Sequence, residues 1–146
     1  MPAEAELRLT FRWQVHPGGR PTAALRRIGL AALRRLGQRS AEVGVLVCDD
    51  PTICALNRQY RGKDRPTDVL SFPAGAAPGD GPRYLGDVAI SLDTARRQAA
   101  ERRVPLEREL ALLLLHAVIH LSGYDHEADD GEMARLEARM RRELLR

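Results

Sequence analysis

The clearest chemical signal in this chain is a group of three histidines close together in the sequence. His116, His120 and His126 lie in the stretch HAVIHLSGYDH, and the chain has only one other histidine. Residues four apart on a helix point to the same side, so His116 and His120 can bind one metal ion. Gly123 can end that helix by adopting a positive φ. The chain can then turn back and bring His126 to the same ion.

The type and number of these ligands favour zinc. Three neutral imidazoles leave one position of a tetrahedral Zn²⁺ ion open, which is typical of catalytic rather than structural zinc. No further cysteine or histidine lies near this stretch to close the site. Other transition metals also accept imidazole ligands. We therefore predict one Zn²⁺ ion bound by His116, His120 and His126, and a zinc-bound water whose pKa falls toward about 7.

The spacing of the histidines is also that of the metzincin proteases, H-E-x-x-H-x-x-G-x-x-H. Ala117 occupies the position at which these proteases have a glutamate that acts as general base. Alanine cannot exchange a proton, so the chain has the ligand spacing of a peptidase without its base. Asp125 could supply a base from the neighbouring turn, or it could instead orient a metal ligand.

A second group of candidate residues lies in LNRQYRGKDRPTDVLSFP, residues 56–73. Arg61, Lys63 and Arg65 fall in a short turn between an expected helix and an apolar strand. Because the turn leads directly into that strand, we expect its position to be fixed. Arginine forms bidentate contacts with phosphate and can stabilise charge on a phosphoryl group, so the turn is a candidate phosphate site.

Taken together, these stretches resemble the YbeY family of bacterial rRNA-maturation endoribonucleases. The resemblance includes LGDVAIS at residues 85–91 and covers the chain from about residue 42 to residue 126. It implies a zinc-dependent hydrolase that cleaves phosphodiester bonds of single-stranded RNA. It also implies maturation of the 3′ end of small-subunit rRNA and ribosome quality control, with ribosomal RNA and the small ribosomal subunit as partners.

The resemblance also implies roles for single residues. The three histidines match the zinc ligands of the family, and Arg61 matches an arginine that is important for activity and faces the metal cleft. Ala117 replaces the family's usual glycine, and we expect little consequence beyond tighter packing of the helix. Our hypothesis is that Arg61 binds the scissile phosphate, while Lys63 holds a neighbouring phosphate. The nucleophile stays open between zinc hydroxide and the RNA 2′-hydroxyl.

Two other functions stay open at the level of sequence. A zinc metallopeptidase would share the ligand spacing but would need a base other than the missing glutamate. A non-enzymatic ribosome assembly factor could use zinc only to join its last helices to the sheet. Aromatic residues make up 4% of the chain, so few side chains can stack on unpaired bases. We therefore expect substrate choice to depend partly on the ribosome or on a protein partner.

Composition and local patterns predict the frame that positions these residues. The 146 residues, of which 44% are hydrophobic and 29% charged, predict a single globular domain over residues 1–146. The apolar run Leu110–Leu115 is too short to cross a bilayer, and the N-terminus lacks the pattern of a secretory signal. We expect a cytoplasmic protein without membrane contact. Cys48 and Cys54 are expected to be free thiols, both small and buried.

Hydrophobic periodicity predicts an α+β fold with about four strands in a mixed sheet packed with helices. Gly37 can end the first helix, and Asp50 followed by Pro51 is expected to start the second, with Asp50 as its N-cap. The zinc site is placed on the helix 105–121. The predicted strands span residues 7–15, 42–48, 68–73 and 83–91, and the predicted helices span residues 21–37, 50–60, 92–103, 105–121 and 129–145.

Overall fold

The computed structural model describes residues 6–19, 21–75, 82–124 and 129–145. The order of strands and helices in these ranges agrees with the order predicted from the sequence, and the bounds differ by a few residues at the element ends. The elements are β1 (Glu6–Trp13), α1 (Thr22–Arg35), β2 (Ser40–Cys48), α2 (Asp50–Arg61), β3 (Val69–Pro73), β4 (Arg83–Ser91), α3 (Leu92–Arg102), α4 (Leu106–Leu121) and α5 (Glu132–Leu144).

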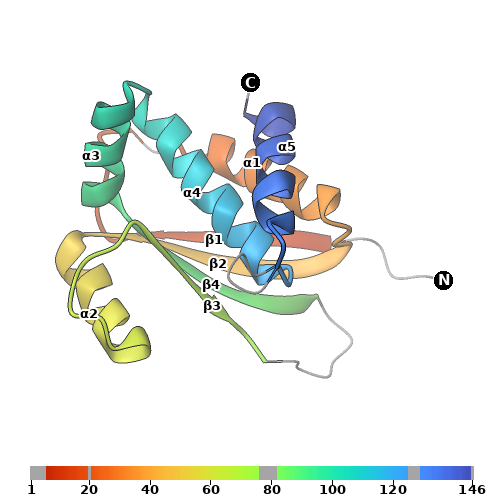
Figure 1. Cartoon of the computed structure of the whole chain (residues 1–146), viewed down its shortest axis with the longest axis horizontal. Helices are drawn as coiled ribbons and strands as arrows, with labels where there is room; N and C mark the ends of the chain where they lie inside the picture. Colours follow the sequence, from red (N-terminus) through yellow and green to blue (C-terminus); the bar gives the residue numbers. More distant parts are fainter. Residues whose placement is uncertain (1–5, 20, 76–81, 125–128, 146) are drawn as a thin grey trace.

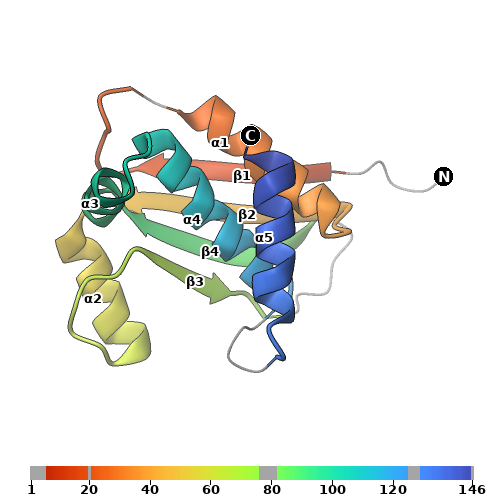
Figure 2. The ribbon, with the colours of Figure 1, turned by 45° about the horizontal axis from the view of Figure 1, so that its top comes forward.

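The strands form one mixed sheet in the order β1-β2-β4-β3. Strands β1, β2 and β4 are parallel, whereas β3 runs antiparallel to β4 and forms one edge. Figure 2 shows this order, with α4 and α5 crossing above the strands. Helices α1, α3, α4 and α5 cover one face of the sheet and α2 lies against the other (Figure 1). The predicted four-stranded mixed sheet of an α+β fold is confirmed.

Helix α4 is the centre of the main hydrophobic core. It contacts α1, α3, α5, β3 and β4, and Leu110, Leu114 and Leu115 are fully buried. A helix that is apolar on nearly all sides is stable only when it is surrounded by other elements. His116 and His120 are half-exposed instead of buried, so they mark the one side of the helix that the core leaves open.

In the described ranges, no helix combines the length and the apolar character that a membrane span requires.

Helix α2 packs on the opposite face of the sheet through a smaller apolar cluster. The buried members of this cluster are Ile53 of α2 and, from the sheet, Cys48, Leu70 and Ala89. Both cysteines are free thiols, as expected, but Cys54 is only half-buried on α2. The prediction of two buried thiols is therefore correct for Cys48 and wrong for Cys54.

The start of α2 differs from the prediction by one residue. Asp49, not Asp50, is the N-cap, and its side chain accepts a hydrogen bond of 2.9 Å from the backbone N–H of Thr52. Asp50 instead accepts hydrogen bonds from the hydroxyls of Ser91 (2.6 Å) and Thr94 (2.7 Å). It therefore joins the beginning of α2 to the beginning of α3, which explains why the cap falls on its neighbour.

A glycine in β4 allows the edge strand to approach closely. Gly86 has a φ of +143°, and a Cβ atom at this position would lie 2.2 Å from the backbone oxygen of Phe72. The register of β4 against β2 shifts at the same place, between Glu42 and Val43. Only glycine tolerates both the conformation and the contact. The LGDVAIS motif thus fixes how β3 sits beside β4, and β3 forms one wall of the site described next.

Candidate active site

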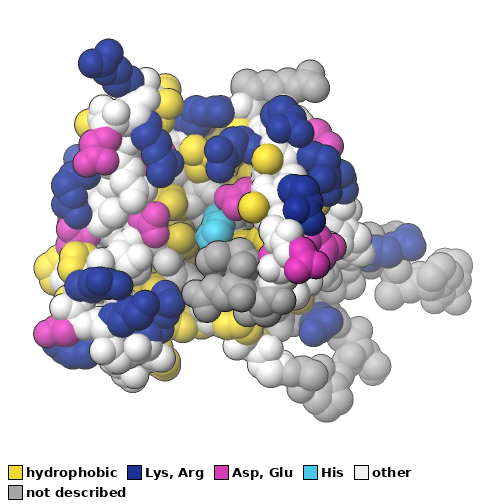
Figure 3. Space-filling view, viewed as in Figure 1, with side chains coloured by type: hydrophobic (Ala, Val, Ile, Leu, Met, Phe, Trp, Pro, Cys, Tyr) yellow, Lys and Arg dark blue, Asp and Glu magenta, His cyan; other side chains and the backbone are white. Residues whose placement is uncertain are grey.

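A cleft of about 880 Å³ opens between β3 and α4. One wall is formed by β3 and the opposite wall by α4, and the ends of α2 and α3 and one side of α5 complete the lining. In Figure 3 a histidine side chain is visible in this hollow, with an acidic side chain beside it and Lys or Arg side chains on two sides. The residues that line the cleft are Tyr60, Arg61, Thr67, Asp68, Val69, Leu70, Ser71, Phe72, Pro73, Arg102, Leu112, Leu113, His116, His120, Glu137 and Arg141.

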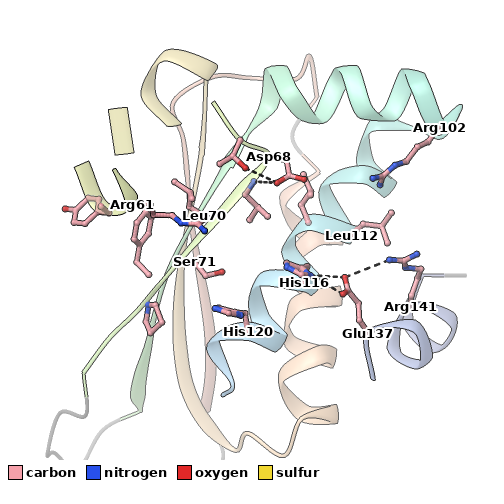
Figure 4. Close-up of a pocket in the computed structure, with 16 residues that line it drawn as sticks. Arg61, Asp68, Leu70, Ser71, Arg102, Leu112, His116, His120, Glu137 and Arg141 are labelled. Carbon is pink, nitrogen blue, oxygen red and sulfur yellow. Dashed lines mark hydrogen bonds and ion pairs between the residues drawn. The ribbon is translucent and has the colours of Figure 1, made fainter. Parts of the chain in front are cut away.

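The core packing of α4 presents two of the predicted ligands to the cleft. Ala117, Val118 and Ile119 lie between the two histidines and are fully buried, so they hold the opposite side of the helix in the core. His116 and His120 consequently project from the same side of α4 into the cleft (Figure 4). The predicted third ligand, His126, and the candidate base Asp125 lie outside the described residues.

The ring of His116 is oriented by a carboxylate on α5. Its Nδ1 atom lies 3.0 and 3.2 Å from the two carboxylate oxygens of Glu137. Because an ionised carboxylate only accepts hydrogen bonds, Nδ1 must carry the proton, and the lone pair of the neutral ring is on Nε2. The hydrogen bond that His116 donates to Glu137 raises the pKa of His116, although burial opposes the shift. Metal-binding histidines usually donate their second ring N–H to a carboxylate in this way.

His120 provides a second observation on whether these residues fit a metal ion. Its Nδ1 atom is buried and has no hydrogen-bond partner among the described residues. A buried polar atom left unpaired costs about 1–3 kcal/mol, so such an atom usually has an ion or a water as its partner. No three His, Cys, Asp or Glu side chains converge within the described ranges. The two imidazoles present fit the ligand type that zinc takes in catalytic sites.

Arg61 is held at the other side of the cleft by the end of α2. The helix ends there because Gly62 adopts the left-handed conformation with a φ of 70°. Asn57, which is 2% exposed, donates a hydrogen bond of 2.9 Å to the carbonyl of Arg65 and so fixes the turn that follows. Arg61 itself is exposed to the cleft, as Figure 4 shows. Lys63 is exposed in the turn and is not among the described residues that line the cleft.

Arg61 differs from the other two arginines of the cleft in having no partner among the side chains that the structure describes. Arg102 is 2.8 Å from an oxygen of Glu109, whose side chain is completely buried. Arg141 lies 3.9 Å from Oε1 of Glu137. Arg61 makes no hydrogen bond or ion pair with another described side chain, so its guanidinium can bind an anion without first losing a contact.

The sequence did not single out several residues of this cleft. Glu137 and Arg141 come from α5, and Arg102 comes from the end of α3. Neither helix carries a motif in its sequence, and both reach the cleft only because they pack against α4. No local pattern could have identified these residues as neighbours of His116.

A protein-family model described as Endoribonuclease YbeY matches residues 23–145 of the chain. The chain belongs to this family. Family membership confirms the resemblance noted in the sequence and supports endoribonuclease activity. The matched region includes both histidines of α4, Arg61 and the whole of the cleft.

Several relatives of the YbeY family resemble the chain over most of its length. Endoribonuclease YbeY of Anaeromyxobacter sp. (strain Fw109-5) is 52% identical over 130 residues, which cover 87% of this chain and 67% of the relative. The protein of the same name from Geobacter sulfurreducens is 43% identical over 136 residues, covering 91% and 89%. The solution structure of TM1509 from Thermotoga maritima has a TM-score of 0.66 and 27% identity, and the match covers 95% of this chain and 89% of that one.

Proposed function

We propose that this chain is a zinc-dependent endoribonuclease that cleaves single-stranded RNA. Its substrate would be ribosomal RNA in the small ribosomal subunit, where it would mature the 3′ end in the cytoplasm and support ribosome quality control. The observation that carries the proposal is the cleft in which two α4 imidazoles face Arg61, an arginine without a partner in the described part of the chain. Membership of the YbeY endoribonuclease family supports RNA cleavage as the reaction that takes place in this cleft.

Zinc would be held by His116, His120 and His126. When bound, it would polarise a phosphate oxygen or make a bound water more acidic. Glu137 keeps the proton of His116 on Nδ1, so the neutral ring would bind the metal through Nε2. Ala117 is fully buried beside the two ligands and contributes packing rather than a base.

Arg61 would bind the scissile phosphate and offset the negative charge that grows on it during cleavage. Its guanidinium is exposed in the cleft, and the α4 wall across the cleft includes the apolar side chains of Leu112 and Leu113. Apolar walls reduce the local dielectric constant and strengthen an ionic contact. Lys63, in the turn outside the described lining, would contact a phosphate further along the strand.

The test is cleavage of ribosomal RNA, free and within small subunits, by repurified protein. We expect His120→Ala and a chelated sample to lose cleavage, and Arg61→Ala to reduce kcat/KM by about 10²–10³, because it removes one donor to the developing charge. Arg34→Ala removes an exposed arginine of α1 outside the cleft and serves as the matched control. Equal cleavage in every sample would indicate a contaminating nuclease and leave a non-enzymatic assembly factor as the better explanation.

The same reactions would identify the nucleophile. A 2′,3′-cyclic phosphate at the new end would mean that the RNA 2′-hydroxyl attacks the phosphate. A linear phosphate formed without that intermediate would mean that water attacks. Mass spectrometry of the shortest product distinguishes these two ends.

A further inference from the structure

One exposed aromatic side chain stands at the cleft. Tyr60 and Tyr84 are the two exposed large hydrophobic side chains of the described ranges, with exposed fractions of 61% and 37%. Tyr60 lines the cleft and precedes Arg61 in the last turn of α2, whereas Tyr84 does not line it. A single exposed aromatic ring is ordinary on a protein surface. Tyr60 is of interest because it lies beside Arg61, so a molecule bound to that arginine would also reach the ring.

The ring of Tyr60 is held in place by a neighbouring ring. It forms a T-shaped pair with the ring of Phe72, with the ring centroids 5.1 Å apart and the planes at 62°. Phe72 comes from β3 and lines the same cleft. The backbone is fixed as well, because Gly62 ends the helix two residues later and Asn57 anchors the turn beyond it. A ring already fixed in this way loses little conformational entropy when a second flat group stacks on it.

We propose that Tyr60 forms a stacking subsite for an unpaired base of single-stranded RNA, next to the phosphate bound by Arg61. Every nucleobase has an apolar face that can stack on an aromatic ring, and the stacking tolerates any sequence. The bases of an RNA duplex are covered by their neighbours, so only an unpaired nucleotide can use the subsite. Tyr60 therefore selects single strands while adding little sequence specificity. This inference rests on the proposed cleavage of RNA.

The first experiment compares three variants in steady-state cleavage of an unstructured single-stranded RNA. We expect Tyr60→Ala to raise KM by about 5- to 150-fold, because one base loses its stacking partner. Tyr60→Phe keeps the ring and should retain the wild-type KM. Tyr84→Ala removes the other exposed tyrosine and is the matched control for loss of a surface ring. An unchanged KM in Tyr60→Ala would overturn the proposal.

The second experiment separates stacking from a general loss of structure and does not need cleavage. Binding of a fluorescein-labelled single-stranded DNA is measured by anisotropy, with one abasic nucleotide placed at each position in turn. For the wild type, one position should lose about 5- to 150-fold in affinity, and Tyr60→Ala should be insensitive at that same position. Equal sensitivity of both proteins at every position would refute the subsite.

These two measurements test the stacking subsite at Tyr60 separately from the proposed cleavage of RNA. If the wild type cleaves no RNA, the proposed function fails, yet the abasic series still shows whether Tyr60 holds a base. If the wild type cleaves RNA and Tyr60→Ala behaves like Tyr84→Ala in both experiments, the cleavage stands and the subsite is wrong.

Discussion

The orientation of His116 depends on one carboxylate that the sequence places far from it. Glu137 lies on α5, and its side chain is 16% exposed, so little water competes for the hydrogen bond to Nδ1. We expect Glu137→Ala to weaken zinc binding by about 10- to 100-fold, because the ring of His116 loses its fixed tautomer and orientation. Glu137→Gln keeps an acceptor oxygen but no charge and should have a smaller effect. Competition with a chromophoric chelator measures the affinity directly.

The control for this prediction is another acidic residue of α5. Glu143 accepts a hydrogen bond of 2.9 Å from Nε of Arg35 and also joins α5 to the rest of the molecule. Glu143→Ala should therefore retain the zinc affinity of the wild type. If both alanine variants lost affinity equally, looser attachment of α5 would be the cause, and Glu137 would have no special role.

At the level of elements, the sequence correctly predicted the strands and helices that depend on a pattern within one segment. The alternation of Leu7, Leu9, Phe11 and Trp13 predicted β1, and the apolar run around Leu110–Leu115 predicted a buried α4. Both predictions were correct because the period of a strand and the composition of a buried helix are read along one segment. The spacing of His116 and His120 is local in the same sense.

The errors and omissions arose where two segments meet. Asp49 and Asp50 are adjacent aspartates before a proline, and local rules cannot decide between them when one is used by another helix. The same reason applies to Tyr60 and Glu137, whose places in the site depend on packing against β3 and α4. Such contacts are absent from any single stretch of sequence.

The junction of α2 and α3 gives a stability prediction. Desolvation raises the pKa of Asp50, but hydrogen bonds from Ser91, Thr94 and Arg97 outweigh this effect and lower it overall. We expect Asp50→Ala to reduce the free energy of unfolding by about 1–3 kcal/mol at pH 7, because it leaves the buried hydroxyl of Ser91 and the half-buried hydroxyl of Thr94 without their acceptor. Urea denaturation of the two proteins measures the difference.

The pH dependence of this difference follows from the sign of the pKa shift. Because the folded pKa of Asp50 lies below the unfolded value of about 3.9, its contribution is complete above that value and is lost as the pH falls through the folded pKa. The difference in the free energy of unfolding between wild type and Asp50→Ala should therefore decrease in acid. Asp64 provides the control, because it forms an exposed ion pair with Arg58. Asp64→Ala should change the free energy of unfolding by less than about 0.5 kcal/mol. A gap that widened in acid would contradict the assigned role.

At the scale of the whole molecule, the core and the candidate zinc site are separate. The main apolar cluster joins α1, α4 and α5 to the sheet through side chains that do not include the histidines. The histidines lie on the one side of α4 that faces the cleft. A core of this kind can fold without metal, whereas a metal that joins elements in place of a core cannot be removed without unfolding.

We therefore expect the protein to remain folded when zinc is removed with a chelator. Its far-ultraviolet circular dichroism should be retained, and thermal unfolding should stay cooperative. Zinc at about 100 times its Kd should add about 2.7 kcal/mol to the free energy of unfolding, because it binds only the folded state. This increment should be absent in His120→Ala, which loses a ligand from the cleft side of α4. Unfolding on chelation would instead show that zinc replaces part of the core, as the non-enzymatic assembly factor requires.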